Sequence, residues 1–140
     1  MKPVIAEISA GAIVYRKKND EVEFLLLQNK GEKWEFPIGH LKEREELYSC
    51  AKREVMEETG LRTVHLDTTF HHHVTIKKEF LRDISFKTIH LFLVEATEEV
   101  TISSEHINYT WAQETEAKAL LKKEYKVTAL QKAISYIQEK

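Results

Sequence analysis

The segment GHLKEREELYSCAKREVMEETGL, from Gly39 to Leu61, constrains the fold of this chain more than any other stretch. Within five residues it collects three carboxylates, Glu54, Glu57 and Glu58. On a helix that starts at Leu47 and turns by about 100° per residue, these glutamates border the apolar stripe instead of opposing it. Because a merely solvated helix carries its charge opposite the core, the pattern predicts an amphipathic helix with carboxylates beside the core.

The other sides of this predicted helix agree with that interpretation. Beside Leu47, the apolar arc holds Tyr48, Ala51 and Val55. The side opposite the core holds Ser49, Lys52 and Met56. Gly60 then stands where a helix C-terminus favours a residue at positive φ, so the helix is predicted to end there.

The crowding of three glutamates calls for a compensating charge. Like charges that are close and partly desolvated repel and raise one another's pKa, unless a cation neutralises them. Glutamate oxygens suit Mg²⁺ or Mn²⁺, which bind a few carboxylates together with phosphate oxygens. The segment therefore indicates a divalent metal site and a substrate that carries phosphate. The alternative is an ordinary acidic surface helix, which the composition permits because 31% of the residues are charged.

The residues that flank the helix fit a metal or phosphate site. Gly39 lies in the predicted loop EFPIGH, where a residue without a side chain lets the backbone approach a ligand closely. Arg53 has two candidate partners, Glu45 and Glu57, and this pairing would hold the loop against the helix.

Length, charge and cysteine content bound the remaining possibilities. We expect one domain over residues 1–140, long enough to bury about two-thirds of its unfolded surface without disulfides. The net charge of −2 gives no general attraction to nucleic acid or anionic lipid, so no nucleic-acid partner is expected, although a local basic patch stays open. Cys50 is the single cysteine, and the start MKPVIAEIS lacks a long apolar core. From these two features we expect a reducing, cytoplasmic location. No run reaches the roughly 18 apolar residues of a membrane span, so we expect no membrane segment.

Apolar periodicity along the rest of the chain predicts an α/β domain. Residues 4–15 and 22–27 read as strands joined by a turn at KKND. Residues 62–76 and 86–96 are rich in β-branched and apolar side chains and are also predicted to be strands. Two helices close the chain, one over residues 114–121 and one whose apolar stripe holds Val127, Leu130, Ile134 and Ile137.

The segment from Gly39 to Leu61 matches the pattern G-x₅-E-x₇-R-E-U-x-E-E-x-G-U, in which U is a bulky aliphatic residue. The matching residues are Gly39, Glu45, Arg53, Glu54, Val55, Glu57, Glu58, Gly60 and Leu61. The segment resembles the Nudix box, and a chance match is rare because seven positions demand one residue type. The resemblance implies a Nudix fold, an α/β/α sandwich around a mixed β-sheet. It also implies hydrolysis of a nucleoside diphosphate linked to another group.

The same resemblance assigns roles within the box. It implies a site for Mg²⁺, with Mn²⁺ as a substitute, formed by the carbonyl of Gly39 and the carboxylates of Glu54, Glu57 and Glu58. Glu45 and Gly60 would be structural. Arg53 would be mainly architectural, and we also include it with Glu57 and Glu58 in the catalytic set.

Four segments outside the box resemble the asymmetrical diadenosine tetraphosphate hydrolases in order and spacing: FLLLQ, KWEFPIGH, KTIHLFLVEA and SSEHINYTW. This resemblance implies that Glu105 is a further catalytic carboxylate and that Lys87 contacts phosphate. Their alternatives are a loop residue and a strand-end charge. We also expect substrate contacts from His40 and Tyr109, where Tyr109 and Trp111 would either stack on a base or belong to the core.

Two residues depart from the pattern of that group. Ile38 stands where many members have lysine between the proline and the glycine of P-K-G-H. Leu91 lies near the position of an aromatic residue that stacks on adenine. These two departures remove a possible phosphate donor and a possible platform for adenine.

Three consecutive histidines, His71 to His73, raise the alternative of a zinc site. In an extended strand His71 and His73 share one face while His72 points away, so ligation by all three would need a bulge. We prefer ordinary strand histidines or a polar contact to substrate. Cys50 has no His or Asn set to activate it, so we expect a small buried residue.

The predicted activity is metal-assisted hydrolysis of a phosphoanhydride, with diadenosine tetraphosphate cleaved to ATP and AMP. Metal ions would neutralise the polyphosphate and lower the pKa of a bound water, and a box glutamate or Glu105 would take its proton; the sequence does not rank Glu58 against Glu105. One alternative is a Nudix pyrophosphatase for a nucleoside triphosphate, a nucleotide sugar or an mRNA cap. Another is a Nudix-fold module that binds a nucleotide without cutting it, which the complete set of box ligands disfavours.

Overall fold

Residues 4–140 are described by a computed structural model, so the first three residues of the start MKPVIAEIS lie outside the description. In chain order the strands are β1 (Val4–Lys18), β2 (Glu21–Asn29), β3 (Trp34–Glu35), β4 (Ile38–His40), β5 (Asp67–Phe80), β6 (Asp83–Glu95) and β7 (His106–Ala112). The helices are α1 (Leu47–Thr59), α2 (Glu114–Leu121) and α3 (Glu124–Glu139).

The strand β1 organises the sheet because it pairs with three other strands. On one edge it pairs antiparallel with β4 over residues 9–11 and with β2 over residues 15–18. On the other edge, residues 4–15 pair in parallel with β6, which in turn pairs antiparallel with β5. The strand order is β3-β2-β1-β6-β5, with β7 beside β2. The sheet is therefore mixed, as the Nudix resemblance implies.

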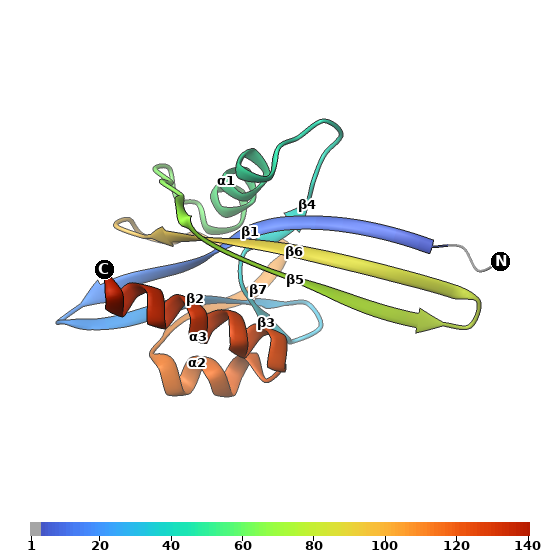
Figure 1. Cartoon of the computed structure of the whole chain (residues 1–140). Coiled ribbons are helices and arrows are strands. Elements are labelled where there is room, and N and C mark those ends of the chain that lie inside the picture. The colour runs from blue at the N-terminus through green and yellow to red at the C-terminus, as the bar shows by residue number, and fades with distance from the viewer. Residues whose placement is uncertain (1–3) are drawn as a thin grey trace.

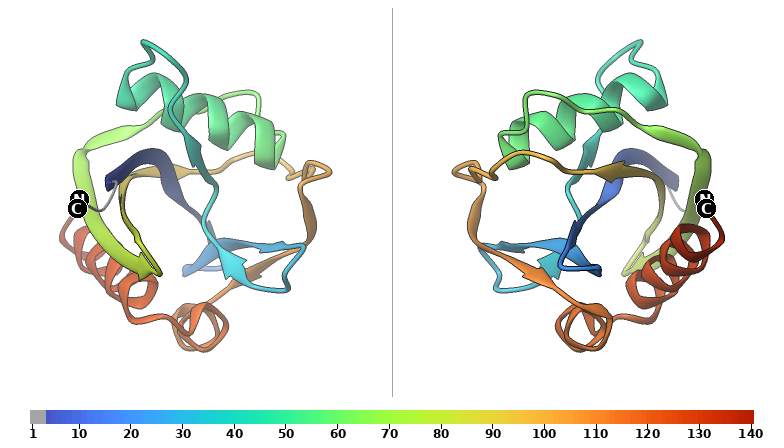
Figure 2. Two further views of the ribbon diagram at one scale, coloured as in Figure 1. Left: turned by 90° about the vertical axis from the view of Figure 1, so that its right-hand side faces the viewer. Right: turned by 90° about the vertical axis from the view of Figure 1, so that its left-hand side faces the viewer.

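Alternation along β1 sends its side chains into two separate cores. Ile13 and Tyr15 pack with apolar residues of α2 and α3, whereas Ala12 and Val14 pack with Val55 of α1. Figures 1 and 2 show α1 on one side of the sheet and α2 with α3 on the other. This arrangement confirms the predicted α/β/α sandwich.

The predicted hairpin at the start of the chain is present. β1 and β2 join through Asn19 and Asp20, whose φ angles are 52° and 66°. Two consecutive residues at positive φ suit a tight turn that matches the twist of the flanking strands. The turn therefore lies in the second half of the predicted KKND segment, whereas Lys17 and Lys18 still pair with β2 as part of β1.

Helix α1 has nearly the burial pattern that its sequence predicts. Its buried residues are Cys50, Ala51, Glu54, Val55, Glu58 and Thr59. The side opposite the core, with Ser49, Lys52 and Met56, is exposed. The prediction that Tyr48 belongs to the buried apolar arc is wrong, because Tyr48 lies in the first turn of the helix and is 50% exposed. The centre of its ring lies 5.0 Å from that of Phe92. Gly60 ends the helix at a φ of 72°, as predicted.

The two C-terminal helices also follow the sequence. α2 occupies the predicted residues 114–121, and α3 buries Ala129, Leu130, Ala133 and Ile134. Val127 and Ile137, which belong to the predicted stripe, are only partly buried at its margins. Of the helices in residues 4–140, none is long and apolar enough to cross a bilayer.

Candidate active site

Arg53 ties the loop that precedes α1 to the helix itself. Its Nε and Nη2 donate to the two carboxylate oxygens of Glu45, at 2.7 and 2.8 Å, and Nη2 also donates to the carbonyl of His40 at 3.2 Å. Its Nη1 donates to Glu54 at 2.7 Å and to Glu57 at 3.3 Å. The hydrogen bonds between Arg53 and Glu45 lower the pKa of Glu45 to about 2. Arg53 thus makes the predicted pairing and also compensates part of the glutamate charge.

Gly39 allows the carboxylate of Glu54 to lie directly against strand β4. A Cβ atom built on Gly39 would come within 2.1 Å of the Glu54 carboxylate carbon and within 2.2 and 2.3 Å of its oxygens. Gly39 itself is fixed by its pairing with Ala10 of β1. The predicted need for a residue without a side chain therefore has a specific cause, which is the space taken by Glu54.

Glu58 is the most deeply buried carboxylate of the box, at 3% exposure. Its Oε1 lies 3.7 Å from Nε2 of His106 on β7, and the same nitrogen lies 3.1 Å from Oε2 of Glu35 on β3. Its Oε2 has no hydrogen-bond partner among the described residues. Three segments that are far apart in the sequence thus meet at His106.

The pKa of Glu58 reflects this burial and its acidic surroundings. Burial first, and then the charges of Glu54, Glu35, Glu105 and Glu57, raise the pKa of Glu58 to about 9. Glu105, in the turn before β7, is exposed, and its backbone N–H donates to Ser103 Oγ at 3.3 Å. The charge of Glu105 is therefore one of those that raise the pKa of Glu58.

These carboxylates fit a divalent metal ion. The unpartnered Oε2 of Glu58 is a hard oxygen donor in a crowded acidic site, which is the environment that Mg²⁺ and Mn²⁺ prefer. Within residues 4–140, no three His, Cys, Asp or Glu side chains already converge on one point, and Arg53 holds Glu54 and Glu57. To bind a metal ion, Glu54 and Glu57 would therefore give up part of their hydrogen bonding to Arg53 and contact the ion instead.

A small cavity of about 80 Å³ adjoins Glu35 and contains the predicted phosphate contact, Lys87. Besides these two residues, its lining includes the side chains of Tyr125 and Lys126 from α3. Lys126 Nζ donates to the carbonyl of Trp34 at 2.9 Å, and burial lowers the pKa of Lys126. The sequence did not single out Glu35 and His106 as site residues, although they lie within the KWEFPIGH and SSEHINYTW segments. It also missed Tyr125 and Lys126, whose local pattern is that of ordinary helix residues.

The structure does not bring all predicted substrate contacts together. The ring of His40 is exposed, with its Nε2 3.5 Å from an oxygen of Glu7 on β1. Tyr109 on β7 is 38% exposed and does not belong to the lining of the cavity that holds Lys87. Trp111 packs against the core on the α1 side, which is the structural role left open for it.

Cys50 and the consecutive histidines lie where the sequence predicts. Cys50 is fully buried, and burial raises its pKa to about 11, which leaves the thiol unreactive. His71 and His73 share one face of β5, with ring centres 5.8 Å apart. Alternation turns His72 to the opposite face, on which Val74 packs toward α3.

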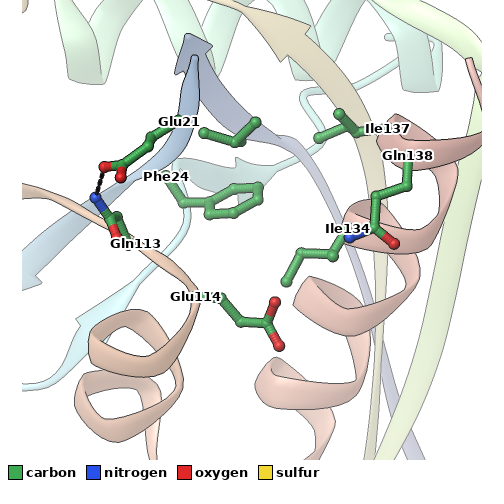
Figure 3. A pocket seen from close by; sticks show the side chains of 8 residues that line it. Glu21, Phe24, Gln113, Glu114, Ile134, Ile137 and Gln138 are labelled. Carbon is green, nitrogen blue, oxygen red and sulfur yellow. Dashed lines mark hydrogen bonds between the residues drawn. The ribbon is translucent and has the colours of Figure 1, made fainter. Parts of the chain in front are cut away.

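A larger pocket, of about 280 Å³, lies around the start of β2, α2 and the end of α3 (Figure 3). It combines apolar side chains with Glu21, Gln113 and Glu114, and Gln113 donates a hydrogen bond to Glu21. Its lining shares no residue with the box or with the Lys87 cavity. This pocket is therefore separate from the candidate active site.

The family follows from comparison with known proteins. The family model described as the NUDIX domain matches residues 6–131. The chain therefore belongs to the Nudix family and is a Nudix hydrolase. Members of this family generally use divalent metal ions.

Within the family, the chain is similar to proteins named bis(5'-nucleosyl)-tetraphosphatase (asymmetrical). The protein from Caenorhabditis elegans is 31% identical over 111 residues, which cover 75% of this chain and 78% of the relative. The protein from Mus musculus is 32% identical over 138 residues, covering 86% and 88%. A solved binary complex of a C. elegans Ap4A hydrolase superimposes with a TM-score of 0.82 at 24% identity, over 96% of this chain and 99% of that one, which confirms the Nudix fold.

Replacing Gly39 with alanine is expected to remove most activity without unfolding the chain. The added Cβ would meet only the end of a flexible side chain, so Glu54 would move while α1 and β4 stay in place. We expect kcat to fall by roughly tenfold or more, because the expected role of Glu54 as a metal ligand depends on its position. Steady-state kinetics and a thermal melt measure the two effects.

Gly11→Ala is the matched contrast for this substitution. Its added Cβ would lie 2.0 Å from the backbone oxygen of Pro37, which cannot move aside as a side chain can. We therefore expect Gly11→Ala to destabilise the fold. A Gly39→Ala protein with wild-type kcat would show that the position of Glu54 does not matter for turnover.

Proposed function

We propose that this chain hydrolyses diadenosine tetraphosphate (Ap4A) asymmetrically, to ATP and AMP, with Mg²⁺ as its cofactor and Mn²⁺ as a substitute. The names of the C. elegans and mouse relatives support this substrate class. The observation that carries the proposal is the contact of His106 with both Glu58 and Glu35. This contact brings the SSEHINYTW segment, which resembles a segment of these hydrolases, next to the buried carboxylate of Glu58.

The residues of the box would divide the work as follows. Glu54, Glu57, Glu58 and the carbonyl of Gly39 would hold the metal, which when bound supplies positive charge to the polyphosphate and acidifies a water ligand. Glu58 or Glu105 would receive the proton of the attacking water. Arg53 would position the glutamates through the hydrogen bonds that it makes to them.

The cavity beside Glu35 would receive part of the substrate outside the scissile bond. The ammonium groups of Lys87 and Lys126 suit a polyphosphate. Ile38 and Leu91, the two departures from the related hydrolases, line this same cavity with Lys126 and Tyr125. Lys126 would thus provide the ammonium group that position 38 lacks, and Tyr125 an aromatic ring in place of the one missing near position 91.

A substrate panel tests this assignment. With Mg²⁺, we expect kcat/KM for Ap4A to exceed that for ATP, a deoxynucleoside triphosphate, a nucleotide sugar or a cap analogue. A long polyphosphate engages the metal site and both lysines at once, whereas a nucleotide sugar offers only a diphosphate. A clear preference for another nucleotide would indicate the alternative Nudix pyrophosphatase. Tight binding of Ap4A without any product would indicate a binding module.

Replacing Glu105 with glutamine is expected to lower kcat by roughly a hundredfold while it changes substrate binding much less. The amide keeps the size of the side chain but can neither take a proton nor contribute the charge that acts on Glu58. The pH profile of kcat should change as well. Glu99→Gln, in the preceding exposed loop, is the matched control. An unchanged kcat across the pH range would return Glu105 to the role of a loop residue.

A further inference from the structure

Three histidines gather on the face of the sheet that His71 and His73 share. The third is His90 of β6, which is the cross-strand partner of His73. The ring centre of His90 lies 5.1 Å from that of His71 and 5.7 Å from that of His73. The centres of His71 and His73 are 5.8 Å apart. The sequence pattern of consecutive histidines hid this cluster, because His72 does not belong to it and His90 does.

The ring centres of His71, His73 and His90 are spaced as in a tetrahedral metal site, but their nitrogens do not yet converge on one point, so His73 must turn to complete the set. Three imidazoles on one ion, with metal–nitrogen bonds of about 2.0–2.1 Å, place their ring centres about 5 Å apart. Two residues on one face of a strand and the residue opposite one of them can supply such a set, since cross-strand side chains start about 5 Å apart. His73 pairs directly with His90, and His71 lies in the irregular stretch of β5 between Asp67 and His72. The three observed separations are all within an ångström of that value.

Two of the nitrogens already lie side by side. His71 Nε2 and His90 Nδ1 are 2.8 Å apart and share a hydrogen bond. Two nitrogens bound to one tetrahedral ion are about 3.3 Å apart. If the two nitrogens move apart by roughly half an ångström, the ion can therefore take the place of the shared proton. The ring of His71 is supported by that of Phe92, whose centre lies 4.7 Å away, while His73 is exposed and free to turn toward the pair.

From this geometry we propose that His71, His73 and His90 form a site for a borderline divalent ion such as Zn²⁺. Neutral imidazole is a good ligand for Zn²⁺ and a poor one for Mg²⁺, which prefers carboxylate oxygens. The site is therefore chemically distinct from the glutamates of the box. Because His71 and His73 are exposed, the fourth position of the ion faces solvent and is filled by water.

Zinc titration of the metal-stripped protein tests the site. The protein competes for Zn²⁺ with a chromogenic chelator in the presence of excess Mg²⁺, which occupies the carboxylates of the box. We expect one Zn²⁺ to bind per chain and to raise the melting temperature. In His90→Ala and His73→Ala the affinity should fall by roughly tenfold or more, since even the loss of a residue outside the ligand set costs that much.

His72→Ala is the matched control, because it removes a histidine from the same strand but from the opposite face. The His72→Ala protein should bind Zn²⁺ as the wild type does. Because His73 is exposed, the His73→Ala protein is expected to fold normally, so a loss of Zn²⁺ affinity in it reports on the site itself. Co²⁺ substitution gives a second readout, an intense tetrahedral absorption band that the two cluster variants lose. Equal Zn²⁺ affinity in all four proteins, or no stoichiometric binding by the wild type, would overturn the proposal.

Discussion

The Glu58→Gln protein is expected to be folded and nearly inactive, with kcat lowered by roughly a hundredfold or more. The amide fits the buried space beside His106 but cannot become the anion that a metal ion binds. Glu57→Gln should lose activity for the same reason, although Glu57 is exposed. Glu46→Gln, an exposed carboxylate just before the same helix, is the control. Near-wild-type activity in both box variants would contradict the metal-site assignment.

The Glu58→Gln substitution should also change how the stability of the protein depends on pH. Because the pKa of Glu58 is raised from 4.5 to about 9, the metal-free folded chain keeps a proton that the unfolded chain loses. Its free energy of unfolding should therefore decline as pH rises from about 4.5 to about 9. This decline should be weaker in Glu58→Gln, and Mg²⁺ should stabilise the wild type more than the variant. Urea unfolding across this pH range, with and without Mg²⁺, measures both.

Replacing Arg53 with alanine is expected to cost about 2–4 kcal/mol of stability and most of the activity. The substitution removes the bidentate hydrogen bonds from Arg53 to Glu45. It also removes the hydrogen bonds that hold Glu54 and Glu57 in position. Arg16→Ala is the matched control, because Arg16 makes one 2.7 Å ion pair with Glu23 on the β1–β2 hairpin. That more exposed pair should contribute less than about 1 kcal/mol. Chemical denaturation at pH 7 compares the two, and equal losses would contradict a special role for Arg53.

The contribution of the Arg53 and Glu45 pair also has a predictable pH range. The pKa of Glu45 is lowered from 4.5 to about 2, so the stabilisation is fully present above about pH 4.5 and is lost as pH falls toward 2. The wild type should therefore lose more stability than Arg53→Ala between these two pH values. A parallel decline in both proteins would show that the pair is not the source of the acid sensitivity.

The local elements of the fold are predictable from the sequence because they depend on periodicity over a few residues. The bounds of α2, the end of α1 at Gly60 and the turn at Asn19 and Asp20 all follow from propensity and spacing. The core face of α1 follows as well. Tyr48 is the exception, because exposure in a first helical turn depends on how far the neighbouring sheet extends, which helical spacing does not report.

The contacts that complete the site depend on pairing between distant strands. Glu35 lies in a strand of only two residues, and it reaches His106 because β3 and β7 both pair with β2. The burial of Glu58 against His106 depends on that same topology. Lys126 is similar, since the helical pattern of α3 does not reveal which cavity its first turn meets. Local sequence pattern therefore locates the glutamates of the box and misses the residues that surround them.

The most direct test of the central claim is the fate of the oxygen atom of water in the cleavage of Ap4A. The enzyme is incubated with Ap4A and Mg²⁺ in water labelled with ¹⁸O, and the separated nucleotides are analysed by mass spectrometry. If water attacks the phosphorus four along the chain from one adenosine, the products are AMP, which carries the label, and ATP, which does not. Two molecules of ADP, or label in ATP instead of AMP, would contradict the account.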